Sequence, residues 1–392
     1  MTHSSTSSST NAKTNTTPPP QSGVHDHSKP AKTAIVLVNL GTPEAPTAKA
    51  VRPYLRQFLS DSRVVEIPKF IWWFILNGII IPFRSKQSAT KYASIWTKDG
   101  SPLKLHTLNQ AALLQGHLHQ RGHQVEVIPA MSYGQPGITS VLEKLQHDGA
   151  ERILILPAYP QYSGTTTASV FDAVFNYFST VRNIPELRLI KHYHDQDGYI
   201  VALAQSIRTH WAQHQRAGHL VMSFHGVPKR TLLLGDPYHC ECYKTARLVA
   251  QQLGLDASEY TVTFQSRFGK TEWLQPYTLP TLLELAKKPQ SRVDVICPGF
   301  TSDCLETLEE INIEGRHAFL QAGGKEFYYI PCLNEDPLWI SGLAGIVETH
   351  IHGWPTGIEQ QRQLQTDAFT SATLAMALKN KQDANITSAG MP

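Results

Sequence analysis

Short apolar runs alternate with longer amphipathic stretches along most of this chain. The apolar runs end in turns rich in glycine and proline, as buried strands do, and the stretches between them have the 3.6-residue period of helices. The pattern predicts two successive sets of four strands, at residues 33–39, 124–128, 152–156 and 187–191, then 219–224, 260–264, 292–297 and 325–330. The clearest predicted helices are 47–60, 103–120, 238–253 and 303–320.

Strands and helices that alternate this regularly form parallel sheets with helices on both faces. The fold class is therefore α/β, with two similar domains predicted at residues 33–200 and 201–352. A single eight-stranded barrel is the alternative, but the long insertion between the first two strands breaks its spacing. Residues 1–32 are rich in Ser, Thr, Pro and Asn, which predicts a disordered tail, and residues 353–392 are predicted to form a polar C-terminal tail.

Composition narrows the class of protein further. Of 392 residues, 41% are hydrophobic and 17% are charged, as in a globular protein with a large core. The net charge of +3 and the lack of a Lys/Arg run give no reason to expect a nucleic acid partner. Five cysteines, an odd number without scaffold spacing, indicate a reducing compartment and hence a cytoplasmic location.

One segment, residues 67–83, is apolar enough to raise the question of a membrane. Its apolar run is shorter than the roughly 20 residues that a spanning helix needs, and Pro68, Gly78 and Pro82 interrupt it. A buried helix and an exposed apolar lip are both compatible with the pattern. The lip would contact an apolar ligand or a membrane surface, so we expect at most peripheral contact with the inner membrane surface.

Candidate catalytic and ligand-binding residues are expected at the carboxyl ends of the strands, where open α/β sheets bind ligands. His225 ends an apolar strand there, and an imidazole accepts a proton near pH 7 or binds a metal. Asp303, Glu306 and Glu310 follow another strand at offsets of three and four, so they share one face of the predicted helix. Such carboxylates guide a divalent cation. A structural histidine and a solvated acidic face are the alternatives.

Aromatic residues gather after the same strands and suit a large planar ligand, although core packing explains any one of them equally well. Arg84 and Ser101 are candidates to meet a carboxylate of that ligand. The chain lacks G-x-G-x-x-G after its first strand and has no H-E-x-x-H or C-x-x-C, which disfavours a nucleotide enzyme or a zinc protease. The aromatic candidates are Tyr133, Tyr159, Tyr162, Trp273 and Phe300.

Several segments, in order from about residue 34 to residue 345, resemble the signature segments of the ferrochelatase family. They are LVNLGTPE, YLRQFLSD with RVVEIP, the GSPL turn, YPQYSGTT, SFHG, GDPY, FQSRFGKTEWLQPYT and CPGFTSDCLETLEEI. The resemblance implies two Rossmann-like, doubly wound domains, each with a four-stranded parallel sheet, and a porphyrin cleft between them. It also implies a lyase that inserts Fe(II) into protoporphyrin IX to form protohaem, the last step of haem biosynthesis.

By the same resemblance, His225 and Glu306 are the catalytic pair of the metal site, with Asp303 and Glu310 beside them. His225 would accept pyrrole protons, and the carboxylates would deliver iron or relay protons. Fe(II) is then a substrate, and no permanently bound cofactor is expected. The positions implied to contact the macrocycle or its propionates are Tyr133, Ser101, Trp273 and Phe300.

Two positions depart from the family pattern. Many members have Arg where this chain has Ser132, and some have His where it has Cys304. Some members also hold a [2Fe–2S] cluster, which needs four thiolates. Here Cys332 is the last cysteine, so we predict no cluster. A chelatase for coproporphyrin or another tetrapyrrole or metal, and a porphyrin or haem carrier, remain as alternative functions.

Overall fold

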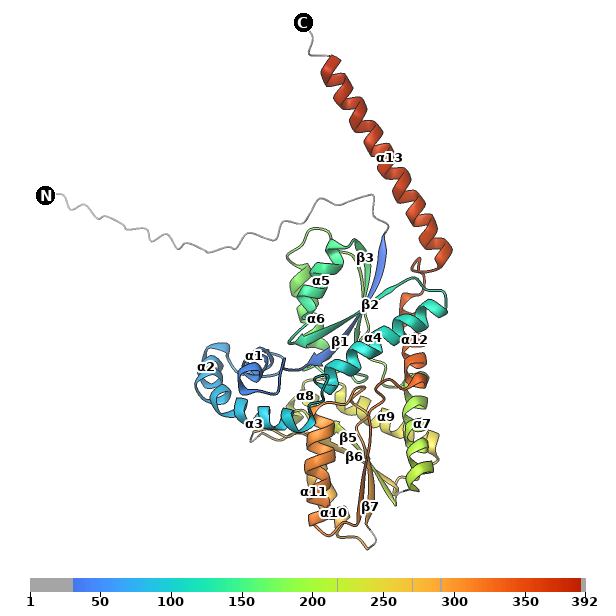
Figure 1. Cartoon of the computed structure of the whole chain (residues 1–392). Helices are drawn as coiled ribbons and strands as arrows, with labels where there is room; N and C mark the ends of the chain where they lie inside the picture. The colour runs from blue at the N-terminus through green and yellow to red at the C-terminus, as the bar shows by residue number, and fades with distance from the viewer. Residues whose placement is uncertain (1–30, 217, 270, 290, 389–392) are drawn as a thin grey trace, which may run out of the picture.

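A computed structural model describes residues 31–216, 218–269, 271–289 and 291–388. Most of the predicted N-terminal tail, residues 1–30, lies outside the described residues. Two four-stranded parallel sheets form the body, with orders β2-β1-β3-β4 and β6-β5-β7-β8 (Figure 1). Their strands are β1 (Lys32–Gly41), β2 (Glu126–Tyr133), β3 (Ala150–Pro157), β4 (Glu186–Leu189), β5 (His219–His225), β6 (Tyr260–Gln265), β7 (Arg292–Ile296) and β8 (Glu326–Ile330).

The predicted α/β architecture of two similar doubly wound units is confirmed, because both sheets have the same strand order relative to the chain. The strands are continuous apolar runs because helices cover both faces of each sheet. In β1, for example, every residue from Thr33 to Asn39 is buried. The predicted second strand, 124–128, is wrong in its position, since β2 starts at Glu126 and continues to Tyr133.

Helices follow most strands and pack against the sheets. In the first half they are α1 (Ala48–Leu59), α2 (Lys69–Ile75), the π-helical turn η1 (Leu76–Ile80), α3 (Ile81–Ile95), α4 (Pro102–Gln120), α5 (Ile138–His147), α6 (Thr167–Phe178) and α7 (Asp197–His214). In the second half they are α8 (Lys229–Leu233), α9 (Tyr238–Leu253), α10 (Thr278–Ala286), the π-helix η2 (Glu306–Gly315), α11 (Arg316–Gln321), α12 (Pro337–Ile351) and α13 (Ile358–Ser388).

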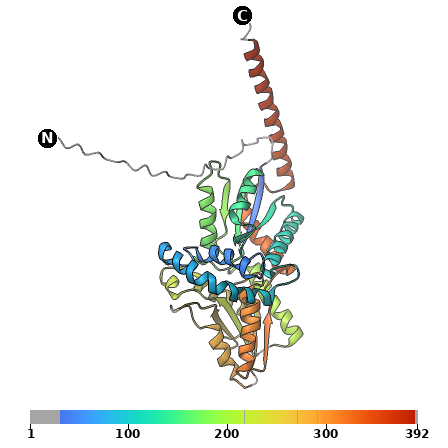
Figure 2. The same cartoon turned by 60° about the vertical axis from the view of Figure 1, so that its left-hand side comes forward.

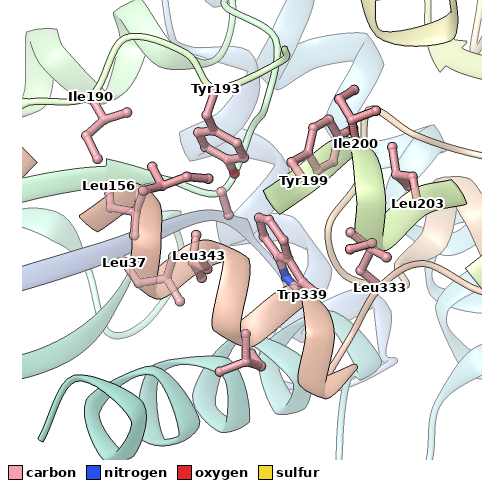
Figure 3. Packing of buried hydrophobic residues seen from close by; sticks show 14 of the residues in the cluster. Leu37, Leu156, Ile190, Tyr193, Tyr199, Ile200, Leu203, Leu333, Trp339 and Leu343 are labelled. Carbon is pink, nitrogen blue, oxygen red and sulfur yellow. The ribbon is translucent and has the colours of Figure 1, made fainter. Parts of the chain in front are cut away.

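One apolar cluster joins the two sheets into a single body. Trp339 of α12 is 1% exposed and lies against Tyr193 and Tyr199, with ring centroids 6.0 and 5.8 Å away (Figure 3). Helix α7 follows the first sheet but packs on α9, whereas α12 follows the second sheet but packs on α4. A Cβ atom on Gly198 would lie 2.7 Å from the Cα of Gly342, so glycine permits the close approach of α7 and α12.

Two segments lie outside this body. Helix α2 has no buried residue, and Phe70, Trp73 and Phe74 are 77%, 59% and 55% exposed, so the buried-helix interpretation of residues 67–83 is wrong there. Where a loose polar tail was predicted, the chain forms α13, which points away from both sheets (Figures 1 and 2). Within the described residues, no helix combines the length and apolar character needed to cross a membrane.

Candidate active site

The imidazole of His225 is held at the carboxyl end of β5 in one defined orientation. Its Nδ1 lies 2.6 Å from the backbone carbonyl of Gly226. A carbonyl oxygen only accepts hydrogen bonds, so Nδ1 carries the proton and donates it. In the neutral ring, Nε2 then has a free lone pair, which is the form that accepts a proton or binds a metal.

Two aromatic rings flank this imidazole. The ring centroids of Trp273 and Phe300 each lie 6.4 Å from that of His225. Trp273 approaches closely because the next residue is glycine: a Cβ atom on Gly226 would lie 3.0 Å from the indole and 2.7 Å from the carbonyl oxygen of Gln265. The structure therefore brings together three of the predicted site residues, contributed by three separate segments.

The acidic residues lie on a π-helix. Residues 306–315 have i→i+5 hydrogen bonds, and the α-helical form begins only at Arg316, so the predicted α-helix over 303–320 is wrong in type and in start. Long π-helices are rare and are frequently found at functional sites. Gln265, at the end of β6, donates to the backbone carbonyl of Glu306 at 2.7 Å, which fixes this helix against the edge that carries His225.

The carboxylate of Glu310 is held by Ser266 and lies within electrostatic reach of His225. The Ser266 backbone N–H and hydroxyl donate to its two oxygens at 2.7 and 2.5 Å. Ser266 has a φ of 64°, a left-handed conformation that non-glycine residues rarely adopt and that is common at active sites. Burial raises the pKa of Glu310 above its ordinary value, while the Ser266 donors and the positive charge of a protonated His225 act in the opposite direction.

Tyrosines of the first half surround Glu306. Burial raises the pKa of Tyr54, Tyr92 and Tyr159, and the negative charge of Glu306 adds to the effect on each of them. Leu305, the preceding residue, packs into the apolar cluster that contains Tyr54 and Tyr92. Glu306 therefore extends from the second half of the chain toward a tyrosine wall of the first. The sequence analysis missed Tyr54, Tyr92 and Ser266, because nothing in their local pattern marks them.

Asp303 has a different environment from the other two predicted acids. It is 5% exposed, and its oxygens accept hydrogen bonds from Thr307, Tyr329 and Asn334 at 3.0, 2.5 and 2.7 Å. Its carboxylate therefore already has buried donors, an arrangement that holds the start of η2 in place. The metal role predicted for Asp303 stays a prediction, and these contacts favour a positioning role.

The remaining predicted residues lie around this group. Tyr133 is buried, and its hydroxyl donates to Asp61 at 2.7 Å. Ser101 is buried immediately before α4. Arg84 lies over the ring of Phe268, 4.6 Å from the centroid, and burial lowers the pKa of its guanidinium. Within the described part of the chain, Arg84 has no carboxylate partner.

Comparison with known proteins gives a family. A family model described as Ferrochelatase matches residues 32–351. The ferrochelatase of Janthinobacterium sp. (strain Marseille) is 68% identical over 330 residues, which cover 84% of this chain and 90% of that relative. The ferrochelatase of Herminiimonas arsenicoxydans is 65% identical over 332 residues, which cover 85% of this chain and 90% of that relative.

A solved structure of SirB from Bacillus subtilis with Fe3+ matches with a TM-score of 0.50 at 12% identity, over 81% of this chain and 96% of that one. At this identity the likeness supports the fold alone, and it agrees with two parallel four-stranded sheets. The family model and the relatives go further, because they cover nearly all of both sheets and every residue of the site. The chain therefore belongs to the ferrochelatase family, a class of lyases that insert iron into a porphyrin.

Proposed function

We infer that this protein inserts Fe(II) into protoporphyrin IX to form protohaem, the last step of haem biosynthesis. The observation that carries the proposal is the placement of His225, whose Nε2 lone pair is free, within electrostatic reach of the carboxylate of Glu310. Two groups that accept protons, next to two aromatic rings, suit a reaction that removes two protons from a flat macrocycle.

In the proposed reaction, His225 and Glu310 transfer protons and Glu306 delivers the metal. His225 accepts a pyrrole proton at Nε2, and Glu310, whose pKa is raised by burial, accepts the second or relays it outward. Glu306 brings in the iron, since carboxylate oxygens bind divalent cations. Asp303 positions η2 through its own buried hydrogen bonds. Fe(II) and the porphyrin are substrates, and no permanently bound cofactor is part of the proposal.

The porphyrin contacts are assigned by chemistry. Trp273 and Phe300 are assigned to the ring faces and Arg84 and Ser101 to the propionates, while Tyr133 belongs to the apolar cluster around Tyr54 and Tyr92. Protoporphyrin carries two propionates and coproporphyrin four. Arg63 pairs with Asp172 and Arg230 with Glu66, so among these arginines Arg84, over the ring of Phe268, is the one proposed to meet a propionate.

The proposed substrate also needs a route into the site, and the exposed apolar surface around α2 provides one. The apolar side chains of α2 and its neighbours form a lip, which we define as Phe70, Ile71, Trp73, Phe74 and Phe83, all more than half exposed. Protoporphyrin is poorly soluble in water, so an apolar lip suits its transfer from a membrane surface. The proposal is a cytoplasmic enzyme with at most peripheral membrane contact at this lip.

Anaerobic insertion assays test the proposal. The purified chain should insert Fe(II), and also Zn(II), into protoporphyrin IX faster than into coproporphyrin. His225→Ala should lower turnover at least about 100-fold, the lower bound for a positioned general base, with the fold intact by circular dichroism. His147→Ala, at a side chain that is 82% exposed, is the matched control and should be unchanged.

Three outcomes would count against the assignment. More than about a tenth of the activity left in His225→Ala would exclude that residue as the base. A faster reaction with coproporphyrin would reassign the substrate. Tight porphyrin binding without metal insertion would make the chain a carrier.

A further inference from the structure

A second group of metal-ligating side chains lies apart from His225, on the connection between β4 and α7. His192 and His194 belong to this connection, and Glu241 belongs to α9. Among the residues that the structure describes, this is the only group of three or more His, Cys, Asp or Glu side chains whose ligand atoms all lie within 4.8 Å of one another.

The two imidazoles point their Nδ1 atoms at the same carboxylate. Nδ1 of His192 lies 2.7 Å from one oxygen of Glu241, and Nδ1 of His194 lies 3.4 Å from the other. Ligand atoms that share a tetrahedral metal at bond lengths near 2.1 Å are about 3.4 Å apart. Small rotations of His192 and Glu241 therefore convert the observed arrangement into a metal-binding one.

The buried histidine provides an independent sign of a ligand. His194 is 5% exposed, and its Nδ1 makes no hydrogen bond in the structure. An unpaired buried polar atom is destabilising, and a metal ion at this position would give the Nδ1 lone pair a partner.

The carboxylate is already oriented for such a role. Glu241 is also buried, and the backbone N–H of Tyr162 donates to its second oxygen at 2.7 Å, as an outer-shell donor does in metal sites. Lys244, three residues after Glu241 on α9, pairs with Asp195 at 2.5 Å. His192 is partly exposed, so solvent or another ligand can complete the coordination.

We propose that His192, His194 and Glu241 form a binding site for a divalent first-row transition metal, distinct from the site at which iron enters the porphyrin. Two imidazoles and one carboxylate with an open position suit Zn(II) or Fe(II). The ligands come from both halves of the chain, since the histidines follow the first sheet and Glu241 lies on a helix of the second. A bound ion therefore ties α9 to the first half and stabilises their contact.

Competition titration of the full chain with Zn(II) and a chromogenic chelator tests this site. His194→Ala and His192→Ala should each lose one Zn(II) equivalent or bind it at least about tenfold more weakly, because even an outer-shell change typically costs 10- to 100-fold in affinity. His147→Ala, an exposed histidine outside the cluster, should keep the wild-type stoichiometry. Zn(II) should raise the thermal midpoint of the His225→Ala protein, and this shift should disappear when His192→Ala is added.

His192 is the safer position, because its partly exposed ring can be removed without opening the core. Equal Zn(II) stoichiometry and affinity in the wild type and in both histidine variants would overturn the proposal. So would a protein in which His225→Ala removes every bound Zn(II) equivalent and His192→Ala removes none. Neither readout needs porphyrin metallation, so the outcome is independent of the proposed chelatase activity.

Discussion

Removal of the Ser266 hydroxyl should change the pH dependence of metal insertion while leaving the proposed bases in place. In Ser266→Ala, Glu310 loses the hydroxyl donor at 2.5 Å and keeps the backbone N–H at 2.7 Å. That hydroxyl stabilises the ionised carboxylate and so lowers its pKa, against the larger opposing effect of burial. Its loss therefore raises the pKa of Glu310 further above the ordinary value.

The size of this change follows from the energy of the bond. A hydrogen bond to a charged group contributes about 1.5–3 kcal/mol. Loss of this bond raises the pKa of Glu310, and since about 1.36 kcal/mol corresponds to a tenfold change in a protonation equilibrium, the effect on the pH profile should be about 1–2 pH units. Glu310 accepts a proton only when it is ionised, so the acid limb of the kcat profile should move to higher pH by the same amount. On the alkaline side of this limb the rate should be nearly that of the wild type.

Zn(II) insertion into protoporphyrin, followed by fluorescence from about pH 5 to about pH 9, measures the kcat profile across its acid and alkaline limbs. Ser206→Ala is the matched control, because its hydroxyl bonds only to the carbonyl of Leu203 on α7, and its profile should match the wild type. An acid limb of Ser266→Ala that coincides with that of the wild type would refute Glu310 as a proton acceptor. A uniform loss of rate at every pH would instead mean that Ser266 only shapes the site.

Two further predictions concern the lip and the cysteines. Replacing Trp73 and Phe74 with Ser should weaken porphyrin binding or liposome association with little change in stability, because both side chains are mostly exposed. Unchanged binding in both assays would show that the lip takes no part in substrate entry. Trp72→Ser is the informative contrast, since its indole N–H bonds to the carbonyl of Leu59 at 2.6 Å, and it should lower the thermal midpoint instead. An anaerobically purified sample should contain no iron–sulfur cluster. Four of the five cysteines are buried, and burial raises their pKa values and so disfavours the thiolate form: Cys242, Cys297, Cys304 and Cys332. Only Cys240 is exposed. Visible charge-transfer bands, with iron and acid-labile sulfide in equal amounts, would contradict that expectation.

The fold was most accurately predicted from the sequence in segments whose residues are all buried. Strands covered on both faces read as apolar runs, so all eight were found and His225 was correctly placed at a strand end. The error at β2 has a physical cause, because Pro129 lies inside the strand and proline normally argues against a strand interior. β2 is an edge strand, where a missing N–H can face away from the sheet.

Other parts of the site depend on contacts between distant segments, which local pattern does not encode. Ser266, which has a positive φ, holds Glu310 across the contact between the loop after β6 and η2. The tyrosines around Glu306 come from α1, α3 and the end of β3, far away in sequence. The group of His192, His194 and Glu241 was missed for the same reason, since its members lie on separate elements.

The π-helix shows why spacing alone was insufficient to assign the acids. Residues at offsets of three and four share a face of an α-helix, which is why Asp303, Glu306 and Glu310 were predicted to act together, while Glu309, between them in sequence, was not considered. In the structure, Lys91 of α3 bonds to both Glu309 and Glu314 at 2.8 Å. Five residues on an α-helix rotate these side chains about 140° apart, whereas i→i+5 bonding aligns them. Lys91 therefore pairs with Glu309 and Glu314 along one side of the π-helix, whereas Ser266 holds Glu310 on another.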